Sequence, residues 1–310
     1  MKPKIVFMGT PEFAVASLDK LVETGCDIVG VITSPDKPGG RGMHLQQSAI
    51  KKYALEKGLN ILQPEKLKDP IFLDQLRSLN ADLQVVVAFR MLPEVVWNMP
   101  PMGTINLHGS LLPQYRGAAP INWAIINGEK ETGVTTFKLQ QEIDTGNTLL
   151  AEKIPIGDDE TAGELHDKMK LVGAELLLKT VEGIVEGSLK DIPQPSDQGQ
   201  TALKHAPKIF TETCHINWNK TVDEVYDLIR GLSPYPAAFT ELDGKKMKVF
   251  KVTRHDGSKP SDALPGSYLT DKKTYLLFAC IDGYLSVAEL QLEGKKKMGV
   301  EEFLRGYHFR

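Results

Sequence analysis

Short apolar runs and helical patterns alternate at the start of the chain. An apolar run over residues 5–9 ends in a glycine, and apolar residues then recur at helical spacing from Ala14 to Val22, before Gly25. A second apolar run covers residues 27–33. Short apolar runs favour strands, whereas the 3.6-residue spacing favours a helix. The order strand, helix, strand predicts the first unit of a doubly wound parallel sheet.

Local signals predict where two helices begin. Thr10 is placed to cap a helix, with Pro11 at its first position and Glu12 in its first turn. Thr161 and Glu164 have the spacing of a capping box and predict a long amphipathic helix that runs towards residue 186. Further helices are expected over residues 48–58 and 118–127, and further strands over 83–89, 103–108 and 133–139. This alternation predicts an α/β domain with a doubly wound sheet.

The pattern changes after residue 187. Residues 187–207 are rich in Pro, Gln, Ser and Gly, which predicts a linker between two domains. A helix is expected over residues 222–231, followed by short strands over 238–242, 246–254, 274–279 and 284–292. Strands at this spacing predict a small OB-like β-barrel, a fold that often binds nucleic acid. We therefore expect domains over residues 1–189 and 208–310, joined by a linker over 190–207.

Composition places the chain among ordinary soluble globular proteins. It has 310 residues, of which 41% are hydrophobic and 25% charged. The apolar stretch near Met1 is too short for a secretory signal, and no run has the length of a membrane span. The cysteines Cys26, Cys214 and Cys280 are isolated, so they predict neither a disulfide framework nor a metal knuckle. We expect a cytoplasmic protein.

The total charge does not indicate a nucleic-acid binder, but its distribution leaves that possibility open. The 37 Lys and Arg against 40 Asp and Glu give a net charge of −3. Basic residues nevertheless cluster in the second predicted domain, at Lys245, Lys246, Lys248, Lys251 and Arg254 and again at Lys295–Lys297. Such clusters set the local field of a surface. A solvated face explains a single run of this kind about as well as a nucleic-acid contact does.

Asn106 and His108 are the first candidates for chemistry. They end the apolar stretch 103–108, and side chains two apart on a strand point to the same side. Ligands of open parallel sheets bind at the carboxyl ends of the strands, which is where these two residues are expected. Asp144 follows the next strand-like run and completes a candidate trio. Asn, His and Asp together can polarise a carbonyl and move protons.

Several catalytic motifs are missing from the sequence. It contains no G-x-S-x-G elbow, no H-E-x-x-H or C-x-x-C metal motif, no phosphate loop and no G-x-G-x-x-G dinucleotide fingerprint. The remaining chemistry suits direct transfer of a small acyl group to an amine, since an α-amino group has a pKa of about 8 and is partly neutral. Asn106 could stabilise a developing oxyanion, while His108 and Asp144 handle protons. Neither a metal nor NAD is expected.

The sequence resembles the 10-formyltetrahydrofolate-dependent formyltransferases. The resemblance is carried by Asn106–Gly117 (Asn-Leu-His-Gly-Ser-Leu-Leu-Pro-Gln-Tyr-Arg-Gly) and by Asp144–Gly146. Met8–Phe13 and Arg230–Pro236 resemble the branch of that family that acts on initiator tRNA, and the likeness extends over essentially the whole chain. It implies a Rossmann-like catalytic domain followed by an OB-like domain. The implied reaction moves the formyl group of 10-formyltetrahydrofolate to the α-amino group of methionine on initiator tRNA and leaves tetrahydrofolate.

The resemblance also implies roles for individual residues. Asn106, His108 and Asp144 become the catalytic trio. Folate is expected to bind at Ser110, Leu111, Leu112 and Pro113. tRNA is expected to contact Arg41, in the Gly- and Pro-rich loop over residues 34–43, and the lysines Lys245, Lys246 and Lys248. No membrane and no obligate protein partner is implied.

Two segments depart from the family pattern. The loop continues as Gly42-Met43-His44, where further lysine is common, and Phe89–Met91 replaces a Tyr-Gly-type sequence near the expected pterin pocket. Two alternatives also stay open. One is a formyltransferase that acts on a purine precursor or an amino sugar, and the other is an RNA-binding protein with an inactive first domain. The missing glycine fingerprint disfavours a nicotinamide enzyme.

Overall fold

The computed structural model of the chain describes residues 2–39, 44–195, 202–257 and 263–309, and it divides into two compact units. The first unit comprises Met1–Gly117, Gly133–Ile154 and His166–His205. The second comprises Ala118–Thr132, Pro155–Leu165 and Ala206–Arg310. Two short segments from within the first predicted domain therefore belong to the second unit. The domain boundaries at residues 189 and 208 stay a prediction.

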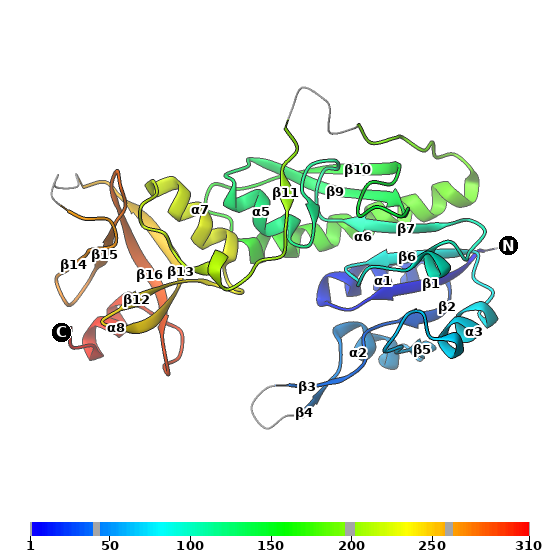
Figure 1. Ribbon diagram of the computed structural model, residues 1–310, viewed down its shortest axis with the longest axis horizontal. Helices are drawn as coiled ribbons and strands as arrows, with labels where there is room; N and C mark the ends of the chain where they lie inside the picture. Colours follow the sequence, from blue (N-terminus) through cyan, green and yellow to red (C-terminus); the bar gives the residue numbers. More distant parts are fainter. Residues whose placement is uncertain (1, 40–43, 196–201, 258–262, 310) are drawn as a thin grey trace. The chain divides into compact units, whose positions relative to one another are not determined.

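A seven-stranded sheet forms the centre of the first unit, in the order β10-β9-β7-β6-β1-β2-β5 (Figure 1). Its strands are β1 (Lys4–Gly9), β2 (Asp27–Ile32), β5 (Ile61–Leu62), β6 (Leu83–Val87), β7 (Thr104–His108), β9 (Glu131–Lys138) and β10 (Thr148–Pro155). The pairs β1–β2, β1–β6, β2–β5 and β6–β7 are parallel, which confirms the predicted doubly wound sheet. β7 and β9 are antiparallel, so the sheet is mixed at this edge.

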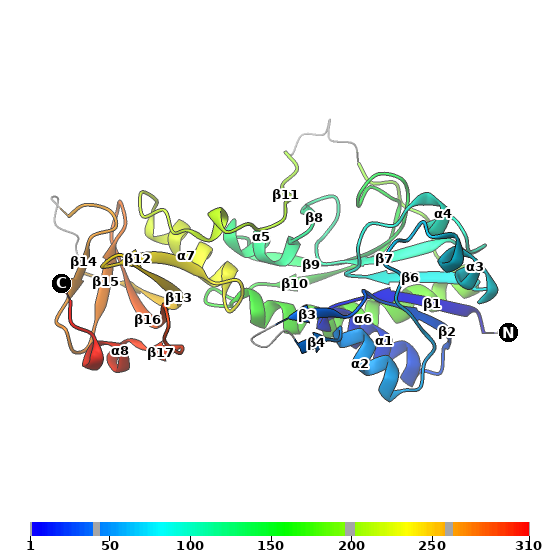
Figure 2. The same cartoon turned by 60° about the horizontal axis from the view of Figure 1, so that its bottom comes forward.

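Helices cover both faces of this sheet (Figure 2). They are α1 (Glu12–Glu23), α2 (Ala49–Glu56), α3 (Pro70–Ser78), α4 (Glu94–Trp97) and α6 (Ala162–Glu186). On one face, Phe72 of α3 and Val96 of α4 share a core cluster with Val86 of β6. On the other face, Gly173 of α6 lies so close to Leu107 that an added Cβ would be 2.9 Å from its Cδ2. The central strands β6 and β7 are therefore covered on both faces of the sheet, as their apolar sequences predict.

The predicted helix starts were confirmed in one case and wrong in another. Thr161 and Glu164 form a capping box, with Thr161 N donating to Glu164 Oε2 at 2.8 Å and Glu164 N donating to Thr161 Oγ1 at 3.3 Å. α1 instead begins after Pro11, which has no side chain able to cap it. Thr10 therefore lies one residue too early for the role that its type suggested.

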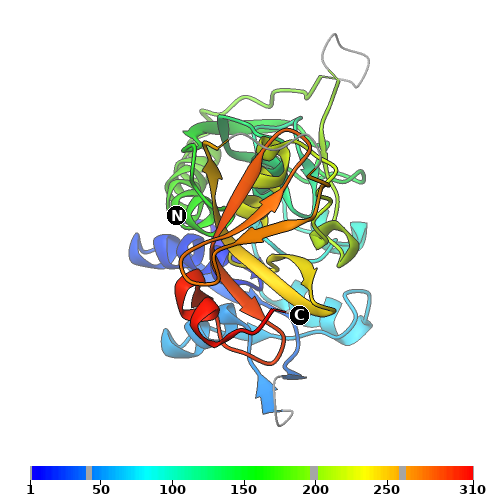
Figure 3. The same cartoon turned by 90° about the vertical axis from the view of Figure 1, so that its left-hand side faces the viewer.

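An antiparallel sheet forms the core of the second unit, in the order β12-β13-β16-β15-β14 with β17 beside β16. Its strands are β12 (Ala238–Leu242), β13 (Lys245–His255), β14 (Tyr268–Thr270), β15 (Leu276–Ala279), β16 (Tyr284–Leu292) and β17 (Met298–Gly299), followed by helix α8 (Val300–Gly306). The register between β13 and β16 shifts near Lys251, and the sheet curls on itself (Figure 3). Trp218 and Phe278 stack inside it, with ring centroids 4.7 Å apart. This curled sheet confirms the predicted OB-like fold.

Helix α7 (Val222–Leu232) explains why the segments 118–132 and 155–165 belong to the second unit. It packs against α5 (Pro120–Ile126), where Gly231 leaves no room for a Cβ beside Ile126. Arg230 of α7 is 5% exposed, and its guanidinium donates to the carbonyl oxygens of Gly157 and Glu160 at 3.2 and 2.9 Å. These contacts bind both segments to α7.

Candidate active site

Asn106 and His108 lie at the carboxyl end of β7 and point to the same side of the sheet, as their spacing predicts. β7 is held between two neighbours at this point: Asn106 is in register with Val86 of β6, and His108 with Thr135 of β9. A strand fixed from both sides is a rigid support, so the two side chains are placed by the sheet and not by a loop.

The ring of His108 is 7% exposed and oriented by a backbone carbonyl. Its Nε2 lies 2.9 Å from Tyr115 O, and because a carbonyl can only accept, Nε2 carries a proton. Nδ1 faces Asp144, with 3.8 Å between Nδ1 and Oδ2. The backbone carbonyl of Tyr115 therefore orients the ring. Asp144 is left beside the nitrogen that can take up a further proton.

Asp144 is 12% exposed and held in an unusual backbone conformation. Its φ is +54°, in the left-handed region, and its Oδ2 accepts a hydrogen bond from Gly117 N at 3.0 Å. Gly146, two residues later, passes close to the end of β9. A Cβ at Gly146 would lie 1.7 Å from Lys138 O, so only glycine fits there. The sequence Asp-Thr-Gly thus suits a tight turn that presents one carboxylate.

Gln194 holds the same turn, and sequence reasoning missed it. Its Nε2 donates to Asp144 O at 2.9 Å and to Gly146 O at 2.8 Å. Its Oε1 accepts from Nε and Nη2 of Arg116 at 3.1 and 2.7 Å. A single glutamine in a Pro-rich stretch carries no local signal of such a contact. The stretch was predicted to be a plain linker.

The amide of Asn106 has capacity for a ligand. Within the residues that the structure describes, its Oδ1 is buried and has no hydrogen-bond partner. A buried polar atom left without a partner costs about 1–3 kcal/mol, so such atoms are rare in folded proteins. A substrate with N–H groups bound beside Asn106 and His108 would satisfy this oxygen.

Hydrogen bonds of Ser110 and Leu112 hold the predicted folate loop in place. Ser110 is fully buried, and its Oγ donates to Gln114 O at 2.6 Å. Thr135 Oγ1 donates to Ser110 O at 2.7 Å and accepts from Leu112 N at 3.2 Å. The Ser110 side chain is therefore engaged inside the loop, which points to backbone groups and apolar side chains as the surfaces for a ligand.

Leu111 packs against β9, while Pro113 lies half-buried in the same loop. A Cβ at Gly133 would be 2.5 Å from Leu111 Cδ2, so Gly133 makes room for this side chain. The folate-binding role of the loop over residues 110–113 stays a prediction.

Residues 89–91, where the sequence departs from the family pattern, lie in the loop that follows β6. Ala88 has a φ of +48°, which ends the strand at Val87. The guanidinium of Arg90 donates to the carbonyl oxygens of Pro64 and Glu65, with 2.8 Å from Nη1 to Glu65 O. Met91 is 74% exposed. Arg90 thus anchors this loop to its neighbouring loop.

Arg41 lies outside the residues that the structure describes. The chain on either side of it forms a hairpin of β3 (Lys37–Gly39) and β4 (His44–Gln46). Asp36, at the base of the hairpin, accepts from Lys51 Nζ at 2.6 Å and from Gln63 Nε2 at 2.9 Å. Both contacts favour the charged carboxylate and lower the pKa of Asp36.

The predicted lysines of the second unit gather at the start of β13. Lys245 is exposed, and Lys246 and Lys248 lie on one face of the strand because they are two residues apart. Lys246 Nζ is 3.7 Å from the ring centroid of Phe239 on β12, and Lys248 Nζ donates to Pro236 O at 3.2 Å. The structure therefore brings Lys246 and Lys248 to one face of β13 beside Phe239, while Lys245 falls on the other face of the strand.

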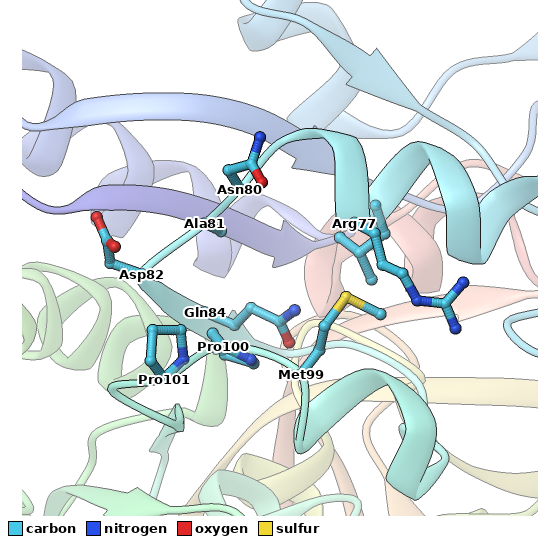
Figure 4. Close-up of a pocket in the computed structure, with 9 residues that line it drawn as sticks. Arg77, Asn80, Ala81, Asp82, Gln84, Met99, Pro100 and Pro101 are labelled. Carbon is cyan, nitrogen blue, oxygen red and sulfur yellow. The ribbon is translucent and has the colours of Figure 1, made fainter.

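A hollow of about 310 Å³ lies at the amino-terminal ends of β6 and β7 (Figure 4). Gln84, which lines it, accepts from Thr104 Oγ1 at 3.1 Å, and Arg77, at its rim, pairs with Asp74 at 2.7 Å. β7 carries Asn106 and His108 towards its other end, so this hollow is separate from the candidate site.

None of the helices in the described residues is long and apolar enough to cross a bilayer.

Comparisons with known proteins agree with this arrangement. Family models described as formyl transferase and as formyl transferase, C-terminal domain match residues 3–181 and 208–308. A methionyl-tRNA formyltransferase of Bacteroides fragilis is 55% identical over 308 residues, which cover 98% of this chain and 95% of that relative.

Two solved structures share the fold at lower identity. The N-formyltransferase of Helicobacter canadensis, in complex with folinic acid and dTDP-3-aminofucose, aligns with a TM-score of 0.69 and 21% identity over 96% of this chain and 100% of its own. HypX of Aquifex aeolicus, in complex with tetrahydrofolic acid, aligns with a TM-score of 0.67 and 18% identity; the chain spans about half (49%) of its length. Family models over both units and a close relative over nearly the whole length show that this chain belongs to the formyl transferase family, together with the methionyl-tRNA formyltransferases.

Proposed function

We propose that the protein transfers the formyl group of 10-formyltetrahydrofolate to the α-amino group of methionine on initiator methionyl-tRNA. The product is N-formylmethionyl-tRNA, with which translation begins, so we place the activity in the cytoplasm. The observation that supports this most is the close approach of His108 and Asp144 beside an Asn106 oxygen that has no partner in the described residues. The 55% identity to a methionyl-tRNA formyltransferase favours this acceptor over a purine precursor or an amino sugar.

The reaction exchanges one C–N bond for another. A bond forms between the methionine nitrogen and the formyl carbon, the bond from that carbon to N10 of the folate breaks, and one proton moves from the amine to N10. Donor folate supplies an activated formyl group, and the protein must stabilise charge on the formyl oxygen and carry that proton. Asn, His and Asp side chains can do both without a covalent intermediate.

His108 is the group best placed to carry the proton. Its Nε2 proton is engaged with Tyr115 O, so the exchangeable site is Nδ1. The Asp144 carboxylate, 3.8 Å from Nδ1, would stabilise the imidazolium that forms there. Gly117 N donates to the same carboxylate and keeps it in place.

Asn106 is the group best placed to act on the substrates directly. Its Nδ2 would donate to the formyl oxygen as that oxygen becomes negative, a contribution worth about 10²–10³ in rate where one such donor has been removed. Its Oδ1 could accept an N–H of the attacking amine, which would satisfy the buried oxygen. The same side chain would then align both reactants.

We propose that folate binds at the loop over residues 110–113. Two leucines and a proline provide an apolar wall for a flat ring. The Ser110 side chain is engaged within the loop, so its contribution to binding would come from the backbone.

We propose that Lys246 and Lys248 bind phosphates of the tRNA. The ring of Phe239, with its centroid 3.7 Å from Lys246 Nζ, holds that charge on this face of the sheet. If each lysine binds one phosphate, each Lys→Ala change should lower the slope of log Kd against log salt by about one unit. An unchanged slope would place the tRNA elsewhere. Arg41 is proposed as a further contact.

The direct test is to incubate the protein with 10-formyltetrahydrofolate and initiator methionyl-tRNA and to measure formylmethionyl-tRNA. We expect product with the wild type and a loss of at least 10²-fold in kcat with His108→Ala, while tRNA binding is retained. His166→Ala is a matched control, since His166 also lies beside a carboxylate, with 3.3 Å between its Nδ1 and Asp167 Oδ1, but on helix α6 and not on β7. Absence of product with folded wild-type protein would refute the proposal.

A further inference from the structure

The side-chain amide of Gln194 uses its whole hydrogen-bonding capacity. An amide has two N–H donors and one oxygen that can accept twice. Both donors bind carbonyl oxygens of the Asp144 turn, and the oxygen accepts twice from Arg116. A side chain with all four bonds made has a single orientation, which is a property of a structural clamp and not of a surface residue.

Backbone pairing near Gln194 places this residue beside the Asp144 turn. Ile192, two residues before Gln194, forms an antiparallel bridge with Thr148 at the start of β10. Thr148 N donates to Ile192 O at 2.8 Å, and Ile192 N donates to Thr148 O at 2.9 Å. An ion pair of 2.9 Å between Lys138 and Asp191 lies on the same stretch. These contacts fix the segment 191–194 beside the turn without involving Asp144 itself.

The contacts close a ring around Asp144. Gly117 N binds the Asp144 carboxylate, and Arg116, the residue before Gly117, binds Gln194. Gln194 in turn binds the Asp144 carbonyl oxygen. Asp144 has a left-handed backbone conformation, which a non-glycine residue keeps only when surrounding contacts hold it. Gln194 makes two of those contacts.

We propose that Gln194 is a positioning residue for catalysis: it holds the backbone of the Asp144 turn so that the carboxylate stays beside Nδ1 of His108. This rests on the proposed catalytic role of Asp144. The four hydrogen bonds of the Gln194 amide go to Asp144, Gly146 and Arg116, so its effect on His108 passes through Asp144. A displacement of a reacting group by about 1 Å can lower a rate by about 10²-fold. We expect Gln194→Ala to lower kcat by about 10- to 100-fold.

The test is a double-mutant cycle with Gln194→Ala, Asp144→Asn and the double variant, assayed by formation of formylmethionyl-tRNA. If Gln194 acts through Asp144, its replacement lowers kcat in the wild type but changes it less than twofold in the Asp144→Asn background. The KM for tRNA stays within twofold in both. Gln194→Glu keeps the shape and the contact to Arg116 but loses both donors, so it should be as slow as Gln194→Ala.

Gln140→Ala is the matched control, because Gln140 Nε2 donates to the side chain of Thr145 in the same turn, at 2.8 Å, and not to its backbone carbonyls among the described contacts. It should keep wild-type kcat. A wild-type kcat for Gln194→Ala or Gln194→Glu, or an equal loss in both backgrounds, would overturn the positioning role. Absence of product with the wild type would instead refute the proposed function, so the two failures are distinct.

Discussion

Replacing Asp144 by Asn removes one negative charge and almost no volume. An Asn side-chain oxygen can still accept the hydrogen bond from Gly117 N, so the turn should keep its shape. What the variant loses is the attraction between the carboxylate and a protonated His108. The experiment therefore isolates the electrostatic part of the proposed role of Asp144.

The distance of 3.8 Å between His108 Nδ1 and Asp144 Oδ2 sets the size of the effect. Two unit charges at about this separation attract by about 1 kcal/mol in water and by about 4 kcal/mol at an effective dielectric constant of 20. With exposures of 7% and 12%, both side chains lie nearer the second case. Since 1.36 kcal/mol corresponds to a factor of ten in rate, we expect kcat to fall by about 10²–10³.

The assay is the single-turnover rate of formylmethionyl-tRNA formation at saturating folate and tRNA. Asp158→Asn serves as the control, because Asp158 is paired with Lys130 at 2.8 Å but is 82% exposed, and it should not change the rate. A loss of less than about fivefold for Asp144→Asn would mean that water screens the pair. The reasoning from burial would then be wrong.

Three further predictions concern the turn and the second unit. Gly146→Ala should lower kcat at least tenfold with tRNA affinity unchanged, because the new Cβ would lie 1.7 Å from Lys138 O. Steady-state kinetics and tRNA binding measure the two effects, and a wild-type kcat would contradict the prediction. Arg230→Met should lower the free energy of unfolding by about 3 kcal/mol, because it removes the ion-pair partner of the half-buried Asp227 and the donor to two backbone carbonyl oxygens. Urea titration measures the loss, and a value below about 1 kcal/mol would refute the prediction. Glu224 has its pKa lowered to about 2, chiefly by Lys220 and by Thr221, so the stability it adds is present above about pH 4.5 and is lost as pH falls towards 2. The urea midpoints of wild type and Glu224→Gln should therefore differ at pH 7 and converge as pH falls from 5 to 3, whereas a constant difference would contradict this assignment.

Local signals in the sequence were sufficient for many elements. The long helix was expected from Thr161 towards residue 186 and is found over 162–186, and strands were expected at 238–242 and 284–292, where β12 and β16 lie. α3 was missed, although Asp69 caps it and Pro70 opens it. In each case the residues that indicate the helix or strand lie within a few positions of each other along the chain.

The active-site geometry depended both on the alternation of side chains along one strand and on tertiary contacts. Period-two alternation alone placed Asn106 and His108 on one side of a strand. The partner that orients His108 could not be found in this way, since it is a backbone carbonyl and every residue has one. The antiparallel position of β9 was likewise decided by how the sheet is completed.

By itself, the sequence determined the doubly wound and OB-like folds, the strand that carries Asn106 and His108, and the family to which the chain belongs. Only the tertiary structure decided that segments 118–132 and 155–165 pack with α7, and that Gln194 binds the Asp144 turn. The physical reason is separation along the chain. Capping and alternation join near neighbours, whereas Gln194 lies 50 residues from Asp144 and 78 from Arg116, and hydrogen bonds over such distances form only after the backbone has folded.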